Sequence, residues 1–275
     1  MGMVTMRETK QKAEKRKRMT QPFQTLTLPD RTLAYQQRIA APEKQGTAGV
    51  FFLGGFASDM TGTKALFLDD LCAREGWAFT RFDYRGHGAS SGRFEEGCIG
   101  DWLDDARRVF DGLTSGPQVL VGSSMGGWIG LLLARERPQR MAGFIGVAAA
   151  PDFTEDLILP TMTAAQIAAM EESGFFYEQD PPPAGEADMR LPITKKLMVD
   201  AKDYLVLRSP LAIPAPVRLI QGQQDVEVPW QTALTLAAHI AQDDTRIMLI
   251  KDAGHRLSRE ADLQALATTV REVMS

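Results

Sequence analysis

The segment Gly122-Ser123-Ser124-Met125-Gly126 has the composition and spacing of a nucleophilic serine turn. It follows an apolar run at residues 118–121 and precedes a helical pattern at residues 125–136. A nucleophile on a sharp turn between strand and helix needs small neighbours two positions away on either side, because side chains there would collide. We therefore predict that Ser124 is a nucleophile. The alternative interpretation is a turn of small residues that only lets strand and helix approach closely.

A serine hydroxyl is a weak nucleophile at neutral pH and needs a neighbouring base, most often a histidine. His255 follows the predicted strand at 246–250 in a loop, where the carboxyl ends of strands gather ligands in an open α/β sheet. His239 lies within a helical pattern, and His87 lies in the turn Arg85-Gly86-His87-Gly88, before the serine in the chain. We predict that His255 is the base.

An acidic side chain is needed to orient that base. Asp225 comes just after the predicted strand at 217–220, and the chain order Ser124, Asp225, His255 is the order used in this kind of strand, turn and helix arrangement. Glu227 is a competitor two residues further on. Asp252, next to the histidine loop, is expected to be a turn or cap residue.

Backbone donors are also needed for the oxyanion that forms when a serine attacks a carbonyl. The N–H of Met125, directly after the serine, is one candidate, and the N–H of Phe56 in Gly54-Gly55-Phe56-Ala57-Ser58 is the other. One such donor stabilises the transition state by about 2.7–4 kcal/mol.

Six short β-rich runs alternate with five longer helical patterns along the chain. Several runs are apolar at consecutive positions, which is typical of strands buried on both faces of a parallel sheet. This alternation predicts an α/β fold with a mostly parallel open sheet and helices on both faces. The predicted strands span residues 49–53, 79–82, 118–121, 144–147, 217–220 and 246–250. The predicted helices span residues 62–74, 101–113, 125–136, 230–241 and 258–273.

A long insertion at about residues 152–209 interrupts this alternation. It contains helical patterns near 164–172 and 194–207, separated by Pro181-Pro182-Pro183. A structureless loop of this length is uncommon in a compact domain, so we predict a helical cap over one edge of the sheet. Its apolar side chains could line an acyl tunnel or pack the cap onto the sheet: Ile158, Leu159, Met162, Ile167, Met170, Phe175 and Phe176.

Composition limits the class of protein. The chain has 275 residues, of which 44% are hydrophobic, and its net charge is −4 although residues 1–18 are strongly basic. We expect residues 1–18 to be a disordered tail and residues 19–275 to form one domain.

The acidic body excludes nucleic acid as a partner, and no apolar run is long enough to span a membrane. Two cysteines, Cys72 and Cys98, form no disulfide framework or metal motif, which favours a reducing, cytoplasmic location.

The residues carry a family likeness over residues 20–275. The chain resembles the α/β-hydrolases, and more narrowly a group of acyl-protein thioesterases, also described as acyl-glucuronide esterases, with their bacterial relatives. The resemblance implies serine hydrolase chemistry with Ser124, Asp225 and His255 as the triad. It favours Asp225 over Glu227, because the acid of that group stands three residues before Val-Pro-Trp. The matching stretches are Gly62-Thr63-Lys64-Ala65-Leu66, Arg81-Phe82-Asp83-Tyr84, residues 116–128, Ser209-Pro210, Val228-Pro229-Trp230 and His255-Arg256.

Together these features predict a serine hydrolase that cleaves an ester or thioester of a small molecule or an acyl-protein through an acyl-enzyme. No metal or organic cofactor is expected. The same triad could instead serve C–C bond hydrolysis or cofactor-free peroxidase chemistry. A third hypothesis is a non-catalytic protein that binds a small ligand. Acyl length, leaving group and oligomeric state stay open.

Overall fold

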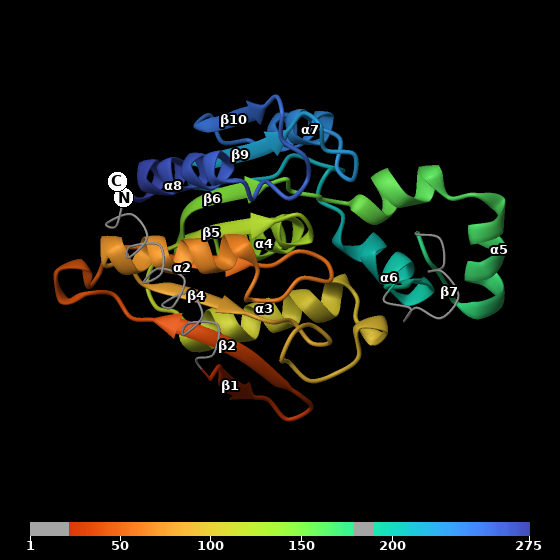
Figure 1. The fold of residues 1–275 in the computed structure, drawn as a ribbon, viewed down its shortest axis with the longest axis horizontal. Helices are drawn as coiled ribbons and strands as arrows, with labels where there is room; N and C mark the ends of the chain where they lie inside the picture. Colours follow the sequence, from red (N-terminus) through yellow and green to blue (C-terminus); the bar gives the residue numbers. More distant parts are fainter. Residues whose placement is uncertain (1–21, 179–189) are drawn as a thin grey trace, which may run out of the picture.

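A single large sheet forms the centre of the structure, which is a computed structural model that describes residues 22–178 and 190–275. The sheet has eight strands in the order β1-β2-β4-β3-β5-β6-β9-β10. Figure 1 shows it running from β1 at the bottom to β10 at the top. β2 is antiparallel to both its neighbours, and the remaining pairs are parallel. The strands are β1 Gln24–Thr27, β2 Thr32–Arg38, β3 Gly49–Leu53, β4 Phe79–Phe82, β5 Gln118–Ser123, β6 Met141–Val147, β9 Val217–Gly222 and β10 Thr245–Ile250.

Helices cover both faces of this sheet. The side chains of α2 and α8 belong to one apolar cluster, and those of α3, α4 and α7 belong to the other. Side chains alternate between the faces along a strand, so Val50 and Phe52 of β3 join the first cluster while Phe51 and Leu53 join the second. Both faces are covered, which is why this strand is apolar at every position. The helices are α2 Thr63–Glu75, α3 Ile99–Leu113, α4 Met125–Glu136, α7 Gln231–His239 and α8 Glu260–Met274.

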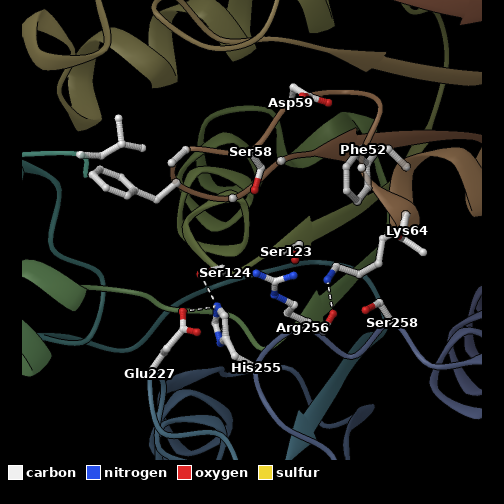
Figure 2. Close-up of a pocket in the computed structure, with 18 of the residues that line it drawn as sticks. Phe52, Ser58, Asp59, Lys64, Ser123, Ser124, Glu227, His255, Arg256 and Ser258 are labelled. Atoms are coloured by element: carbon white, nitrogen blue, oxygen red, sulfur yellow. Dashed lines mark hydrogen bonds and ion pairs between the residues drawn. The ribbon is translucent and has the colours of Figure 1, made fainter. Parts of the chain in front are cut away.

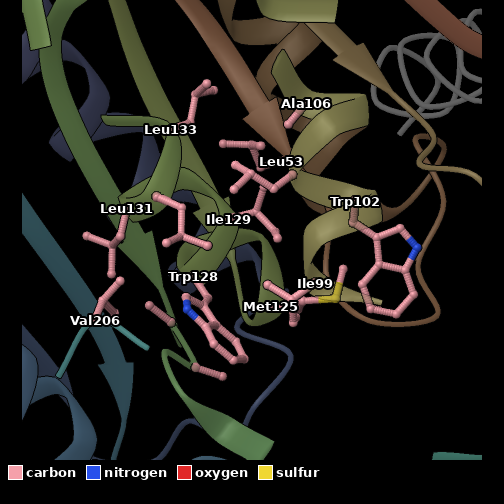
Figure 3. Packing of buried hydrophobic residues seen from close by; sticks show 14 of the residues in the cluster. Leu53, Ile99, Trp102, Ala106, Met125, Trp128, Ile129, Leu131, Leu133 and Val206 are labelled. Carbon is pink, nitrogen blue, oxygen red and sulfur yellow. The ribbon is translucent and has the colours of Figure 1, made fainter. Parts of the chain in front are cut away.

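The helix α4 is the most deeply buried of these five. Every residue from Met125 to Ala134 is buried, and Figure 3 shows these side chains between β3, α3 and the segment at Val206. Trp128 adds a polar tie, because its indole N–H donates to the carbonyl oxygen of Tyr204 over 2.9 Å. A helix enclosed in this way gives the residue before it, Ser124, a rigid support.

The cap is inserted between β6 and β9 along the chain, and it extends to one side of the sheet (Figure 1). It begins with a π-helical turn and includes a two-stranded sheet of β7 and β8. Thr163 and Gln166 form a capping box at the start of α5. The cap elements are η4 Thr154–Ile158, η5 Leu159–Thr161, α5 Ala164–Ser173, β7 Phe175–Phe176, β8 Ile193–Thr194, α6 Lys195–Asp200 and η6 Ala201–Tyr204. Short 3-10 helices at η1 Pro42–Lys44, η2 Phe94–Glu96 and η3 Pro138–Arg140 complete the elements outside the cap.

The predicted α/β fold and cap are confirmed, with two differences in detail. The sequence patterns did not predict β1, β2 or the two short cap strands β7 and β8, and the helix predicted at 194–207 is a short α-helix followed by a 3-10 turn. The strand β1 is mostly exposed, so its residues carry no continuous apolar run. The predicted tail at 1–18 and the prolines at 181–183 lie outside the described residues. In the described parts of the chain, no helix is long and apolar enough to cross a membrane.

Candidate active site

Ser124 occupies a strained turn between β5 and α4. Its φ of 53° and ψ of −121° place a non-glycine residue in a region that side chains rarely adopt, at a cost of about 1–3 kcal/mol. The flanking glycines permit this turn because backbone passes close to both. A Cβ at Gly126 would lie 2.1 Å from the carbonyl oxygen of Leu53, and one at Gly122 would lie 2.4 Å from that of Gly126.

The structure brings together the three side chains predicted as nucleophile, base and acid. The Nε2 atom of His255 lies 3.1 Å from Oγ of Ser124, and its Nδ1 atom lies 2.8 Å from Oδ2 of Asp225. Ser124 follows β5, Asp225 follows β9 and His255 follows β10. Parallel strands end at one edge of the sheet, so residues more than a hundred positions apart meet there. The arrangement can pass a proton from the hydroxyl to an oriented imidazole.

The Asp225 carboxylate is held by several donors besides the histidine. Its side chain is fully buried. It accepts hydrogen bonds from the Gln221 amide at 2.8 Å and from the Glu227 and Val228 backbone N–H groups at 3.0 and 2.8 Å. Burial raises the pKa of Asp225, but the hydrogen bonds from His255 and Val228 outweigh it, so the pKa lies below its ordinary value. The carboxylate is therefore charged at neutral pH and can stabilise a protonated imidazole.

The other candidates for the acid and the base do not take part in the contacts between Ser124, His255 and Asp225. The carboxylate of Glu227 faces Nε2 of His255 at 3.6 Å rather than Nδ1, and its side chain is 66% exposed. Asp252 forms an ion pair of 2.7 Å with Arg259, which fits its expected role in a turn. His239 lies half-buried at the end of α7, with Nδ1 2.8 Å from the carbonyl oxygen of Thr235.

The two predicted oxyanion donors lie beside the serine. The loop containing Phe56 lines the same cavity as Ser124, and Met125 opens α4, where the first N–H groups have no partner within the helix. Within residues 22–178 and 190–275, neither the Phe56 nor the Met125 N–H donates to another backbone or side-chain group. An N–H group without a partner can donate a hydrogen bond to a negatively charged oxygen.

His87 supports the loop at residues 54–58, a contact that the sequence analysis missed. Its imidazole is buried and its Nε2 accepts a hydrogen bond of 3.2 Å from the Ala57 N–H, next to Phe56. Its Nδ1 lies 3.1 Å from the carbonyl oxygen of Arg85, so the proton of the neutral ring lies on Nδ1. Burial lowers the pKa of His87, although the hydrogen bond to Arg85 opposes this. The only sequence signal was its position in a turn after a strand.

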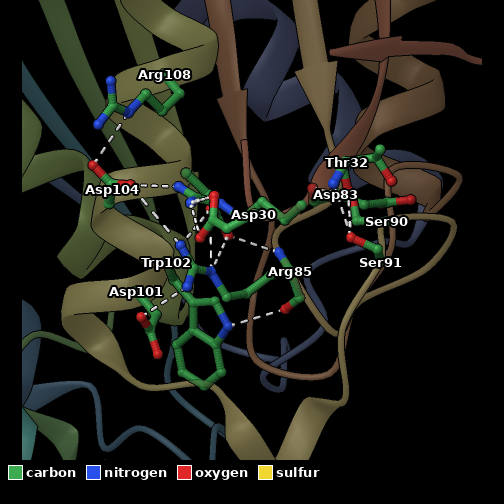
Figure 4. A network of polar contacts seen from close by, with 12 residues as sticks. Asp30, Thr32, Asp83, Arg85, Ser90, Ser91, Asp101, Trp102, Asp104 and Arg108 are labelled. Atoms are coloured by element: carbon green, nitrogen blue, oxygen red, sulfur yellow. Dashed lines mark hydrogen bonds and ion pairs between the residues drawn. The ribbon is translucent and has the colours of Figure 1, made fainter. Parts of the chain in front are cut away.

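An ion-pair network holds the turn that carries His87. Asp105 of α3 is fully buried and accepts hydrogen bonds from Arg31 at 2.6 Å and from the Arg85 N–H at 2.7 Å. Arg85 also pairs with Asp101 at 2.9 Å. Figure 4 shows Arg85 and Asp101 beside Trp102, whose indole N–H donates to the Arg85 carbonyl over 3.2 Å. A buried carboxylate with several charged partners fixes its surroundings, since removing one partner leaves an uncompensated charge.

Ser124 and His255 open into a cavity of about 960 Å³. Polar and charged side chains, including Ser58, Lys64 and Arg256, form much of its wall (Figure 2). None of the seven apolar cap residues considered for an acyl tunnel is among its described lining. Ile158, Met170 and Phe176 are buried in the core, Met162 packs against it, and Leu159, Ile167 and Phe175 are exposed. The structure thus favours packing for the four residues that meet the core, and it favours an acyl tunnel for none of the seven.

The sheet order, the serine turn and the inserted cap define an α/β-hydrolase. Residues 44–172 match the family described as serine aminopeptidase, S33. The bovine (Bos taurus) protein named palmitoyl-protein thioesterase ABHD10, mitochondrial, is 36% identical over 234 residues, covering 84% of this chain and 74% of the relative. The human (Homo sapiens) protein of the same name is 34% identical over 233 residues, with the same two shares covered.

Solved structures agree with these matches. The mouse α/β-hydrolase domain-containing protein 10 is 31% identical, with a TM-score of 0.80, covering 92% of this chain and 98% of that one. A protein from Agrobacterium vitis S4 is 37% identical, with a TM-score of 0.84, covering 93% of this chain and 100% of that one. The chain belongs to the ABHD10 family of α/β-hydrolases.

The expectation of a cytoplasmic location is wrong on these comparisons, because the curated relatives are named mitochondrial. The cysteine argument could not make this distinction. Cys72 and Cys98 are both free and buried, and unlinked thiols indicate reducing surroundings without saying which compartment provides them.

Proposed function

We propose that this protein is a serine hydrolase that cleaves thioesters or carboxylic esters, with Ser124, His255 and Asp225 as its catalytic triad. The observation that carries the proposal is the continuous hydrogen-bonded chain from Oγ of Ser124 through both nitrogens of His255 to Asp225. The printed name of the curated relatives, palmitoyl-protein thioesterase, supports an acyl substrate.

In this mechanism Nε2 of His255 takes the proton of Ser124 as Oγ bonds to the acyl carbon. The Phe56 and Met125 N–H groups stabilise the negative carbonyl oxygen. The bond to the leaving group then breaks, and His255 gives its proton to the departing alcohol or thiol. Water, deprotonated by the same imidazole, attacks the acyl carbon. The bond from that carbon to Oγ of Ser124 then breaks, the carboxylic acid leaves, and His255 returns the proton to Oγ. Asp225 keeps the proton of the neutral ring on Nδ1 and stabilises the charged ring.

Covalent labelling with a fluorophosphonate tests this proposal, because the reagent reacts with an activated serine. We expect the wild-type protein to be labelled and to hydrolyse para-nitrophenyl butyrate and a butyryl thioester. Ser124→Ala should lose labelling and about 10⁶-fold in turnover, as in other triads. Ser123→Ala, which alters the buried neighbouring serine, is the matched control and should keep both.

Folded wild-type protein that neither reacts with the fluorophosphonate nor cleaves any ester would favour the non-catalytic binding hypothesis instead. Labelling without ester or thioester cleavage would favour C–C bond hydrolysis or peroxidase chemistry on the same triad.

A further inference from the structure

Two cations meet in the wall of the cavity that holds Ser124. Lys64 lies in the first turn of α2, and its ammonium donates a hydrogen bond to the backbone carbonyl oxygen of Arg256. Arg256 directly follows His255, and its side chain lines the same cavity. Figure 2 shows both cationic groups on the side of His255 away from Glu227. The two side chains come from segments 192 residues apart in the sequence.

These cations have no acidic partner within the part of the chain that the structure describes. No ion pair joins either one to a carboxylate there, and the first turn of α2 carries no acidic residue. The two acids at the start of α8 have other partners, since Asp262 is paired with Arg259 at 2.8 Å and Glu260 accepts a hydrogen bond from Gln264 at 2.8 Å. Burial and the nearby Arg256 charge lower the pKa of Lys64 to about 8, although the more distant Asp262 charge opposes this with a smaller effect. Two like charges held together without a counter-ion are costly, and an anion between them would remove that cost.

The carboxylates in the cavity wall do not supply this charge. Asp59 accepts hydrogen bonds from the Thr61 N–H and hydroxyl at 2.7 and 2.5 Å. Glu227 lies beside His255, and Glu178 also lines the cavity. None of the three forms an ion pair with Lys64 or Arg256 among the described residues. The cavity wall also contains hydroxyl groups that can donate hydrogen bonds, those of Ser58, Thr63 and Ser258, and Figure 2 shows Ser258 beside the two cations.

We propose that Lys64 and Arg256 form a subsite for an anionic group, a carboxylate or a phosphate, on the ester or thioester that Ser124 attacks. Arg256 can bind two oxygens of such a group at once, while Lys64 supplies a point charge. The inference rests on the proposed function and narrows its substrate class. A charged substrate also suits this cavity, because none of the seven apolar cap residues considered for an acyl tunnel lines it.

Matched pairs of esters test the subsite and show which side of the scissile bond carries the charge. On the acyl side, the anionic para-nitrophenyl hydrogen glutarate is compared with neutral para-nitrophenyl pentanoate. On the leaving-group side, para-acetoxybenzoate is compared with phenyl acetate. We expect the wild-type kcat/KM ratio of anionic to neutral ester to exceed about tenfold in one arm, the value of one charge-assisted contact, and to fall with added salt.

Variants identify the residues responsible. Lys64→Met and Arg256→Gln should each lower that ratio about tenfold, the loss of one charge-assisted contact. Arg256→Lys, which keeps the charge, should retain part of it. Lys202→Met, which removes an exposed cap cation outside the cavity lining, is the control and should match the wild type. Arg256 is exposed, so its variants test the idea even if the Lys64 variant folds poorly.

Two outcomes separate this inference from the proposed function. The proposed subsite is wrong if the neutral esters are cleaved but the wild-type kcat/KM ratio of anionic to neutral ester is near one in both arms. It is also wrong if Lys64→Met and Arg256→Gln both leave that ratio unchanged. In either case the proposed hydrolase function stands. If no ester is cleaved, the proposed function is wrong, and calorimetric titration with glutarate and inorganic phosphate decides the subsite. Binding that weakens in Arg256→Gln would support the subsite, and no binding to the wild type would overturn it.

Discussion

The imidazole of His87 accepts a hydrogen bond from the Ala57 N–H, over 3.2 Å, one residue beyond the proposed oxyanion donor Phe56. Ala57 has a φ of 58°, a backbone conformation that needs support from its surroundings. The ring of His87 is in turn enclosed by Tyr84, Phe94 and Trp102, at centroid distances of 5.6, 5.1 and 5.3 Å. We infer that His87 is a positioning residue that holds the oxyanion loop without touching the substrate.

Replacing His87 with phenylalanine should lower kcat for ester hydrolysis by about tenfold or more, because a small displacement of an oxyanion donor is costly. The aromatic contacts would persist while the acceptor for Ala57 is lost. His87→Gln, which offers an amide oxygen as acceptor, should retain more activity than His87→Phe. Equal activities of the two variants would contradict a role through the Ala57 hydrogen bond.

The same histidine should make stability depend on pH. Burial lowers the pKa of His87 below its ordinary value of 6.5, so the unfolded chain takes up the proton more readily than the folded protein. The stabilisation from the neutral ring is therefore complete above about pH 6.5 and is lost as the pH falls toward the lowered pKa of the fold. Asp83, whose pKa burial raises to about 6, titrates nearby. The free energy of unfolding is therefore measured in urea at each pH for the wild type and for His87→Gln. Asp83 is present in both proteins, so its contribution cancels in the difference. Below pH 6.5 the wild type should lose stability relative to the variant.

Much of the fold could be predicted because the parallel strands are buried on both faces. The predicted ranges for β3, β4 and α4 agree with the structure to the residue. Edge elements gave weaker signals, since the strand β1, Gln24–Thr27, is mostly exposed and has no apolar pattern.

The candidate site was only partly predictable, for a physical reason. Ser124, Asp225 and His255 each follow a strand directly, so the parallel sheet alone requires them to share an edge. The contact between Lys64 and Arg256 is not fixed by strand ends in this way, and neither is the contact between His87 and Ala57. These contacts depend on how loops and a helix terminus fold over that edge, which no local pattern of residues encodes.

The two acids near His255 should differ sharply in importance. Asp225 lies 2.8 Å from Nδ1, whereas Glu227 is mostly exposed and faces Nε2. Asp225→Asn should lower kcat by about 10⁴-fold, because an amide favours the wrong tautomer of the imidazole. Glu227→Gln should lower kcat less than about tenfold, as expected for an exposed charge. Steady-state kinetics on one neutral ester compares them, and a larger loss in the Glu227 variant would reverse the assignment of the acid.

The serine turn should be intolerant of even one methyl group beside it. A Cβ at Gly126 would lie 2.1 Å from the Leu53 carbonyl oxygen and 2.5 Å from that of Gly54. Both belong to backbone, which cannot move aside as a flexible side chain would. Gly126→Ala should therefore reduce the free energy of unfolding by about 1–3 kcal/mol or more, as overpacking does, and should also disturb the oxyanion loop that begins at Gly54.

Gly112 provides the matched control for this substitution. It lies in α3 with no atom within 4 Å of an added Cβ. Alanine has the higher helix propensity, so Gly112→Ala should stabilise the protein by up to about 1 kcal/mol. Urea unfolding of the two variants measures effects of opposite sign from the same chemical change. If Gly126→Ala were as stable and as active as the wild type, the close approach of the β3 loop to the serine turn would not be the constraint that the structure indicates.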